Sequence, residues 1–251
     1  MAGYRKATLI LVVLLQAFVA WRSSDADLPG AMHTWSAGER NVQMQCADDD
    51  VTPEERAGHA SYMTPSELEV IAEINLLRRD PAEYARLRLA PLRIYYHGKL
   101  FFHPDRSPVA IQTHEGVAAL DECIRDLENA KPLPTVFPCE GLTLAAREMT
   151  QDQGTTKRTG HVGSGGTRMP ERIGRYGEWN RLIAENISYG FRKPKDIIAF
   201  LLIDDGVPDR GHRVTLLDRE LNRVGVSIGS HRRYKYMCVT DFAAGYKTNK
   251  P

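Results

Sequence analysis

The sequence predicts an α+β fold in which several amphipathic helices pack against a small antiparallel sheet. Apolar residues recur at helical spacing over about 64–80 and again over about 113–129. Near the C-terminus, inward-facing and outward-facing residues alternate over 224–228 and 236–242, and the connection at 230–233 is short. Two such runs so close together are typical of an antiparallel pair. The sequence has no internal repeat, so a single mixed domain is expected.

The first helix is predicted to begin after Thr64. Thr64 and Glu67 form a capping box, and the proline between them stands at the first helical position. The helical pattern ends near 80–81, and a second short helix is expected over about 83–87. The apolar runs over 92–96 and 100–102 then flank a short connection at 97–99, which predicts a hairpin. His97 and His103 flank this hairpin and are expected at the surface.

Five further segments complete the predicted order of elements. The helix over 113–129 stops before a Pro-rich loop, and another helix over 142–153 stops at Gly154. A glycine-rich loop follows, and then a short helix and a longer one that opens with a proline. The loop spans 155–167, the short helix spans 170–175 and is closed by Gly177, and the longer helix runs from Pro194 to its acidic end at 204–205.

The N-terminus has the pattern of a secretory signal. Basic residues precede an apolar stretch over 7–20, and Ala26 closes a small-x-small cleavage site. A cut after Ala20 and an uncleaved anchor are the alternatives. The apolar stretch is shorter than the roughly 20 residues of a membrane span. We therefore predict a signal peptide over 1–26, a flexible leader over 27–60, one folded domain over 61–248, and a secreted protein with no stable membrane span.

Charge and cysteine content narrow the function further. The net charge is only +1, so the excess of Lys and Arg that nucleic-acid binding requires is missing. Export permits disulfides, and four cysteines allow three pairings. The first expectation is a local bridge between Cys123 and Cys139, which leaves Cys46 and Cys238. The alternative for Cys238 is a buried free thiol.

Four residues in the C-terminal half carry the most chemistry: His161, Glu185, Asp204 and His212. Neutral imidazole is the commonest side-chain metal ligand, and a carboxylate behind it fixes its tautomer. The four residues come from separate segments. A shared function requires all of them to face one cleft.

The segments around these residues resemble the CAP superfamily, the SCP-like domain of cysteine-rich secretory proteins, antigen 5 and pathogenesis-related proteins. The resemblance runs over 141–246, with a similar first helix at 74–81, and covers about three quarters of the chain. The matching pieces are 144–148, His161, 184–186, 211–213, 224–226 and 238–242. It implies a three-layer α–β–α sandwich with a small antiparallel sheet, and a large cleft lined by the four residues.

In that family the histidines can bind a divalent metal such as zinc. Two imidazole nitrogens would supply half of a tetrahedral shell, and water or a ligand would complete it. The resemblance thus implies that His161 and His212 are ligands of a weakly bound ion. Glu185 and Asp204 would be hydrogen-bonded to the imidazoles or to the bound water. The alternative is a polar cluster that binds no metal.

One of the four positions departs from many relatives. They commonly have Glu where this chain has Asp204, and an aromatic residue where it has Leu201. Asp is one methylene shorter, which weakens the case for direct ligation there. Asp205 is the substitute expected if the end of its helix is unwound.

The resemblance favours a secreted binding protein over an enzyme. Some relatives bind sterols or other lipids, and others act at cell surfaces, so a lipid, a metal ion or an extracellular protein is the expected ligand. The alternative is a metal-dependent hydrolase or protease with Glu185 or His212 as general base and a metal-bound water as nucleophile. A third reading is an interaction scaffold whose cleft is vestigial.

Asn186 begins a glycosylation sequon, Asn186-Ile-Ser188. Because it adjoins Glu185, it is expected to lie beside the cleft. A hydrogen-bonding role for Asn186 in the folded protein is therefore favoured over a glycan.

Overall fold

The structure is a computed structural model that describes residues 12–13, 16–22, 62–106 and 109–249. The predicted leader over 27–60 and Cys46 lie outside the described residues. The boundary between signal, leader and domain therefore stays a prediction. Within the predicted signal, two short strands are described by their backbone, β1 (Val12–Val13) and β2 (Gln16–Arg22).

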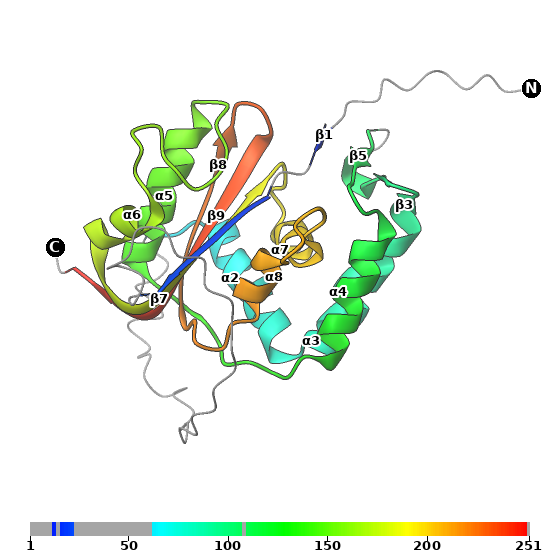
Figure 1. The fold of residues 1–251 in the computed structure, drawn as a ribbon, viewed down its shortest axis with the longest axis horizontal. Helices are drawn as coiled ribbons and strands as arrows, with labels where there is room; N and C mark the ends of the chain where they lie inside the picture. The colour runs from blue at the N-terminus through cyan, green and yellow to red at the C-terminus, as the bar shows by residue number, and fades with distance from the viewer. Residues whose placement is uncertain (1–11, 14–15, 23–61, 107–108, 250–251) are drawn as a thin grey trace, which may run out of the picture.

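A five-stranded sheet forms the middle layer (Figure 1). Its order is β2-β7-β9-β8-β6, and all neighbours are antiparallel except the short parallel pair of β6 with β8. The central strands are long and the edge strand β6 is short: β7 (Gly177–Tyr189), β9 (Lys235–Thr248), β8 (Arg223–His231) and β6 (Phe137–Pro138). The predicted α+β class with a small antiparallel sheet is confirmed.

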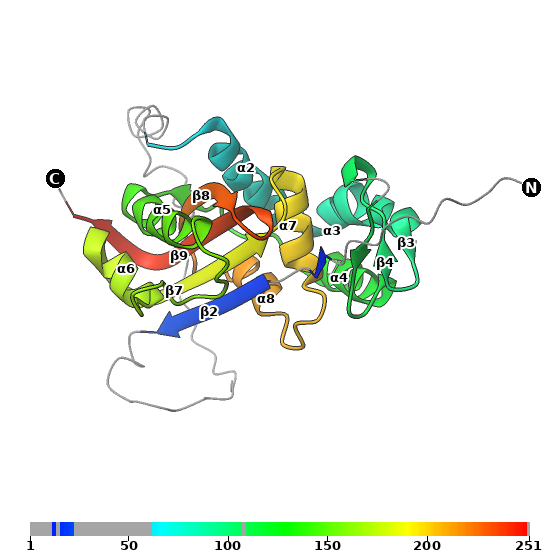
Figure 2. The same ribbon diagram turned by 90° about the horizontal axis from the view of Figure 1, so that it is seen from above.

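Helices cover both faces of this sheet (Figures 1 and 2). On one face lie α5 (Glu140–Gly154) and α6 (Met169–Tyr176), which pack on inward-facing residues such as Ile183 and Ile187. On the other face a larger apolar cluster joins alternate sheet residues to four helices: α2 (Pro65–Arg79), α4 (Val117–Asn129), α7 (Pro194–Ile203) and α8 (Gly211–Leu216). This is the three-layer sandwich that the resemblance implied.

A smaller substructure extends from the larger cluster. After α3 (Pro81–Tyr84) the chain makes a π-helical turn, η3 (Ala85–Leu89), and a 3₁₀ helix, η4 (Ala90–Tyr95). A second sheet of order β1-β5-β4-β3 follows, from β3 (Tyr96–His97), β4 (Leu100–Phe101) and β5 (Ile111–Gln112). A short 3₁₀ turn, η5 (Pro104–Arg106), lies between β4 and β5.

Local sequence signals mark most element boundaries correctly. The capping box is present, because Thr64 Oγ1 accepts the Glu67 N–H and Glu67 accepts the Thr64 N–H at 2.8 Å. The predicted hairpin forms but is shorter, since 90–95 is 3₁₀ helix rather than strand. The helix expected from 113 begins only at Val117, after Gly116 with φ +70°.

The expected bridge between Cys123 and Cys139 is wrong. Both are free thiols, and they lie in different apolar clusters on opposite faces of the sheet. Cys238 is a buried free thiol, as the alternative interpretation had it, with 1% of its surface exposed. Burial raises the pKa of the Cys123 thiol to about 12.

Among the described residues, no helix is long and apolar enough to cross a membrane.

Candidate binding cleft

Strand β7 sorts its polar side chains onto two faces of the sheet. Successive side chains of a strand point to opposite faces. Ile183 and Ile187 pack toward α5 and α6, so Glu185 between them faces the same way. Asn186 faces the other layer, where its Nδ2 donates to the carbonyl oxygen of His212 at 3.2 Å. Asn186 is fully buried, which agrees with the structural role expected for it.

The first histidine–acid pair lies on the α5–α6 face. His161 Nδ1 is 2.7 Å from Glu185 Oε1, and the second carboxylate oxygen of Glu185 accepts from the guanidinium of Arg172 on α6. Glu185 is fully buried, whereas 17% of the His161 side chain is exposed. Because an ionised carboxylate only accepts hydrogen bonds, Nδ1 of neutral His161 carries the proton and Nε2 keeps its lone pair.

The glycine-rich loop holds His161 by its backbone. Gly160 adopts φ +93°, and its N–H donates to Tyr189 Oη at 2.9 Å while its carbonyl accepts from Gln153 Nε2 at 2.6 Å. Tyr189 in turn donates to Gln153 Oε1 at 2.7 Å. The Arg172 guanidinium also donates to the carbonyl of His161 at 3.1 Å. The loop is therefore fastened to α5, β7 and α6 directly beside the imidazole.

Asp241 is a member of this group that the sequence analysis did not single out. It stands opposite Glu185 in the pairing of β9 with β7, on the same face, and it is fully buried. Burial, together with the neighbouring Glu185 carboxylate, raises the pKa of Asp241 well above its ordinary value. Its only sequence signal is its place in the alternation of the last strand, where a carboxyl group occupies an inward position.

The pKa values of Glu185 and Asp241 are shifted in opposite directions. Burial alone would raise the pKa of Glu185, but the hydrogen bond from His161 and the charge of Arg172 outweigh it, so this pKa lies below its ordinary value. Asp241 is therefore the protonated member and Glu185 the ionised one. A carboxylate held this way, buried and already accepting from two donors, is a weak general base.

The second histidine–acid pair lies on the opposite face, at the end of α7. Asp204 adopts the left-handed conformation, φ 54° and ψ 41°, which ends the helix. Its Oδ1 is 2.6 Å from His212 Nδ1, and its Oδ2 accepts the backbone N–H of His212 at 2.9 Å. Both side chains are buried. Asp204 thereby fixes the same tautomer in His212 that Glu185 fixes in His161.

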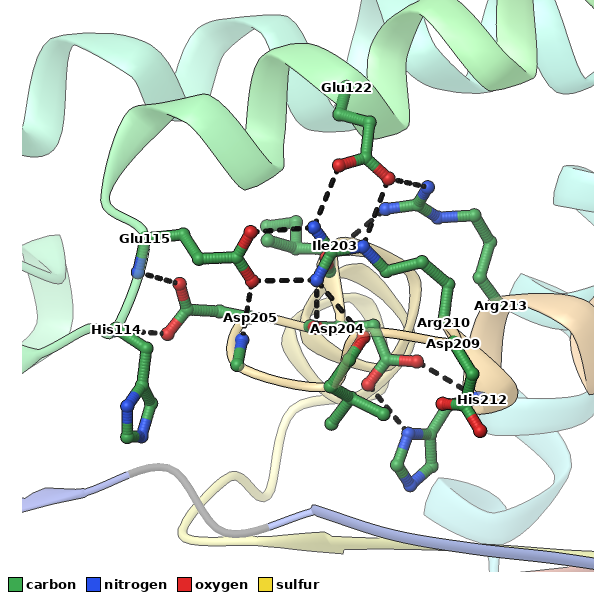
Figure 3. A network of polar contacts seen from close by, with 12 residues as sticks. His114, Glu115, Glu122, Ile203, Asp204, Asp205, Asp209, Arg210, His212 and Arg213 are labelled. Carbon is green, nitrogen blue, oxygen red and sulfur yellow. Dashed lines mark hydrogen bonds and ion pairs between the residues drawn. The ribbon is translucent and has the colours of Figure 1, made fainter.

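Ion pairs hold the turn between Asp204 and His212 in shape (Figure 3). Arg210, also left-handed at φ 50°, donates to the Asp204 carbonyl at 2.9 Å and to both Glu115 and Glu122 at 2.7 Å. Asp205 accepts the backbone N–H groups of 114 and 115 at 2.6 and 2.7 Å. Asp205 is thus occupied in fastening the approach to α4 and does not substitute for Asp204. Leu201 is fully buried.

The two pairs lie on opposite faces of β7, so they can approach each other only around the edge of that strand that faces away from β9. In this structure β2 runs along that edge, and α8, which carries His212, contacts β2. Among the described residues, no three of the four predicted site residues offer ligand atoms within 4.8 Å of one another. The acids are instead each paired with one histidine.

A different group in the described part of the chain does meet that spacing. His103, Asp105 and Asp196 offer ligand atoms within 4.8 Å, so they could hold a metal ion. His103 is 3% exposed, and the expectation that it lies at the surface is wrong because Phe101 and Phe191 pack against its ring.

The hydrogen bonds around His103 show what ion binding there would require. Its Nδ1 accepts the Asp105 N–H at 3.1 Å, which leaves the proton on Nε2, 3.2 Å from Asp196 Oδ2. Lys193 Nζ lies 2.6 Å from Asp105 Oδ2. An ion at Nε2 would have to displace that proton and the lysine, so the group as it stands is a hydrogen-bonded anchor for the start of α7.

Comparison with known proteins assigns the chain by its sequence. The sequence model of the cysteine-rich secretory protein family, CAP, matches residues 72–242, more than half of the chain. Among solved structures, an outer surface protein from Borrelia burgdorferi is similar, with 18% identity and a TM-score of 0.37, over 50% of this chain and 88% of that one. The comparison with curated proteins finds no match.

Proposed function

Because the chain belongs to the cysteine-rich secretory protein (CAP) family, we propose that it is an exported binding protein whose His161 and His212 together take a divalent cation such as Zn²⁺. The ion would help to close the cleft around its ligand. The ligand classes expected from the family are a lipid or sterol and an extracellular protein. The net charge of +1 favours these over nucleic acid.

The observation that carries this proposal is that each histidine is backed by a buried acid. His161 Nδ1 lies 2.7 Å from Glu185 and His212 Nδ1 lies 2.6 Å from Asp204. Histidines that ligate metals usually donate the other ring N–H to such a carboxylate, which orients the ring and raises its basicity. Each histidine is therefore oriented so that its Nε2 would be the ligand atom.

The arrangement also sets the strength of binding. With the acids committed to the imidazoles, only two protein ligands remain, and water or the bound partner would supply the others. Affinity is therefore expected to be lower than at a site with three or four protein ligands. Because the pairs flank β7, the ion would sit at the edge of that strand, which requires β2 to be absent or displaced.

The test is a thermal shift of the exported chain with zinc and with chelator. A ligand that binds only the folded state raises the melting temperature with its concentration. Zinc should stabilise the wild-type chain, and His161→Ala and His212→Ala should each abolish the shift while the proteins stay folded by circular dichroism.

His103→Ala is the matched control, since it removes the histidine of the other group that could hold an ion. Its zinc shift should equal that of the wild type. A shift that disappears in His103→Ala and survives in His161→Ala would place the ion in the wrong cluster and end the proposal. The same result follows if zinc leaves the melting temperature of the wild type unchanged.

A further inference from the structure

The edge of β7 that faces away from β9 is a pairing surface for an extended chain. Along this edge β2 is antiparallel to β7 over seven consecutive partners, from Gln16 opposite Ser188 to Arg22 opposite Leu182. The middle of the register sets Val19 opposite Glu185. Figures 1 and 2 show β2 as the outermost strand of the sheet, beside β7 and α8.

The occupant of this edge comes from a part of the chain that the sequence marks for removal. All of β2 precedes Ala26, after which the predicted signal is cut. Removal would leave 182–188 paired with β9 on one edge and without a partner strand on the other. An unpaired edge of this length is a template for another strand, and proteins normally shield such edges.

We propose that the β7 edge of the mature protein is a binding site for an extended, largely apolar polypeptide segment, which adds to the sheet as an antiparallel strand. Main-chain hydrogen bonds would supply the affinity, and alternate side chains of the segment would reach the two faces. The seven residues of β2 define the length and character of the partner, since five of them are apolar: Ala17, Phe18, Val19, Ala20 and Trp21.

The position of this edge links the segment to the histidines. A strand paired with β7 passes alongside Glu185 and Asn186. Glu185 is hydrogen-bonded to the His161 ring on one face, and Asn186 donates to the carbonyl oxygen of His212 on the other. The segment would therefore pass between the two histidine–acid pairs. The backbone pairing itself needs neither imidazole. A strand on this edge and an ion shared by the two histidines would exclude each other, because the ion requires the edge to be unoccupied, so this inference stands even if the proposed ion site fails.

The experiment uses the chain recovered after export and a fluorescent peptide with the sequence of residues 16–22. Mass spectrometry first establishes the N-terminus, which should lie beyond Arg22. Fluorescence anisotropy should then show saturable binding, and a scrambled peptide should bind more weakly. Binding is measured with chelator present, which separates this result from the zinc test, and His103→Ala, which lies outside both histidine–acid pairs, should bind the peptide as the wild type does.

Backbone methylation gives the sharper control. Alternate N–H groups of a strand point to opposite edges, so one set faces β7 and the other faces away. A peptide N-methylated at 17, 19 and 21 and another methylated at 18, 20 and 22 have the same side chains. One of the two should lose binding at least tenfold and the other should retain it.

Three outcomes would overturn the proposal. The first is a mature chain that still contains residues 16–22. The second is absence of saturable binding, including the case of a mature dimer that excludes the peptide and so assigns the edge to a second copy. The third is equal binding by both methylated peptides, because side-chain burial alone would then account for the affinity.

Discussion

The two histidine–acid pairs fix the same imidazole tautomer by different means. His161 and Glu185 are 24 residues apart and come together only when a loop, a strand and α6 have assembled. Asp204 and His212 are eight residues apart, and a short connection with three residues at positive φ, Asp204, Gly206 and Arg210, brings them together. The first pair depends on the packing of layers, whereas the second depends on local backbone geometry.

The pairs also differ in how their charge is compensated. Glu185 accepts from Arg172 as well as His161, and protonated Asp241 lies beside it. Asp204 accepts two N–H groups from the same histidine, and the nearby Arg210 contacts only its carbonyl oxygen. Removing the cation of the first pair should therefore leave a buried carboxylate without a counter-charge. Removing the acid of the second pair should free the turn that it holds in place.

The largest effect is expected for Arg172→Leu. This change leaves the Glu185 carboxylate buried without its cation, and breaking a buried ion pair in this way costs about 3–5 kcal/mol. Urea denaturation should show this loss in the free energy of unfolding. Glu148→Gln is the control, because it removes the acid of a more exposed arginine pair, that of Arg175, and should cost less than about 1 kcal/mol. Equal costs for the two variants would contradict the comparison.

Asp204→Ala should have the next largest effect. It removes the acceptor for two His212 N–H groups and places alanine in the left-handed conformation, for a combined cost of about 2–4 kcal/mol. Asp204→Asn should cost less, since asparagine tolerates that conformation. Because the backbone N–H of His212 can only donate, the amide oxygen should face it and the amide N–H should face Nδ1. His212 must then carry its proton on Nε2, and the zinc shift should disappear from a folded protein. A nitrogen-15 spectrum of His212 that keeps the wild-type tautomer in Asp204→Asn would contradict this reading.

Much of the fold could be predicted because its signals are local. The capping box at Thr64, the proline that opens α7 and the alternation in β8 and β9 each mark an element from within a few residues. No strand is predicted from the sequence over 177–189, where β7 lies. From 182 to 189 it is buried on both faces, so its residues do not alternate in polarity.

The site was only partly predictable for a related reason. The four residues and their segments can be recognised from sequence, but their sorting onto two faces of β7 depends on the strand register. Arg172 and Asp241 carry no motif, and they join Glu185 only through the packing of α6 and the pairing of β9 with β7. The error over Cys123 and Cys139 has the same origin, because nearness in sequence did not reveal that the sheet separates them.

Asp241→Asn tests the protonation of the first pair through pH. Between its ordinary pKa near 4 and the raised value, folded Asp241 holds a proton that the unfolded chain releases. Native stability therefore falls as pH rises through this window, by up to about 1.4 kcal/mol per pH unit from this group. Asparagine is a neutral donor at all pH values, so the variant should lose this slope.

Urea denaturation from pH 5 to 7 measures the difference. The stability of Asp241→Asn relative to the wild type should increase steadily with pH. Glu185 has the opposite sign, since the stability from its lowered pKa is present above its ordinary value and is lost only in more acidic solution. Parallel curves for the two proteins would mean that Asp241 is ionised in the folded state.

The smallest effect on stability is expected for His161→Gln. Its side chain is 17% exposed, the loop remains fastened through Gly160, and Glu185 keeps the Arg172 cation, so the cost should be about 0.5–1 kcal/mol. His212→Gln is the matched variant on the other face. It should cost more, about 1–3 kcal/mol, because it leaves the buried Asp204 carboxylate without its ring donor. If His161→Gln proved the more destabilising of the two in urea, the loop histidine would be part of the packing between layers, and the contrast between an assembled pair and a locally built pair would be lost.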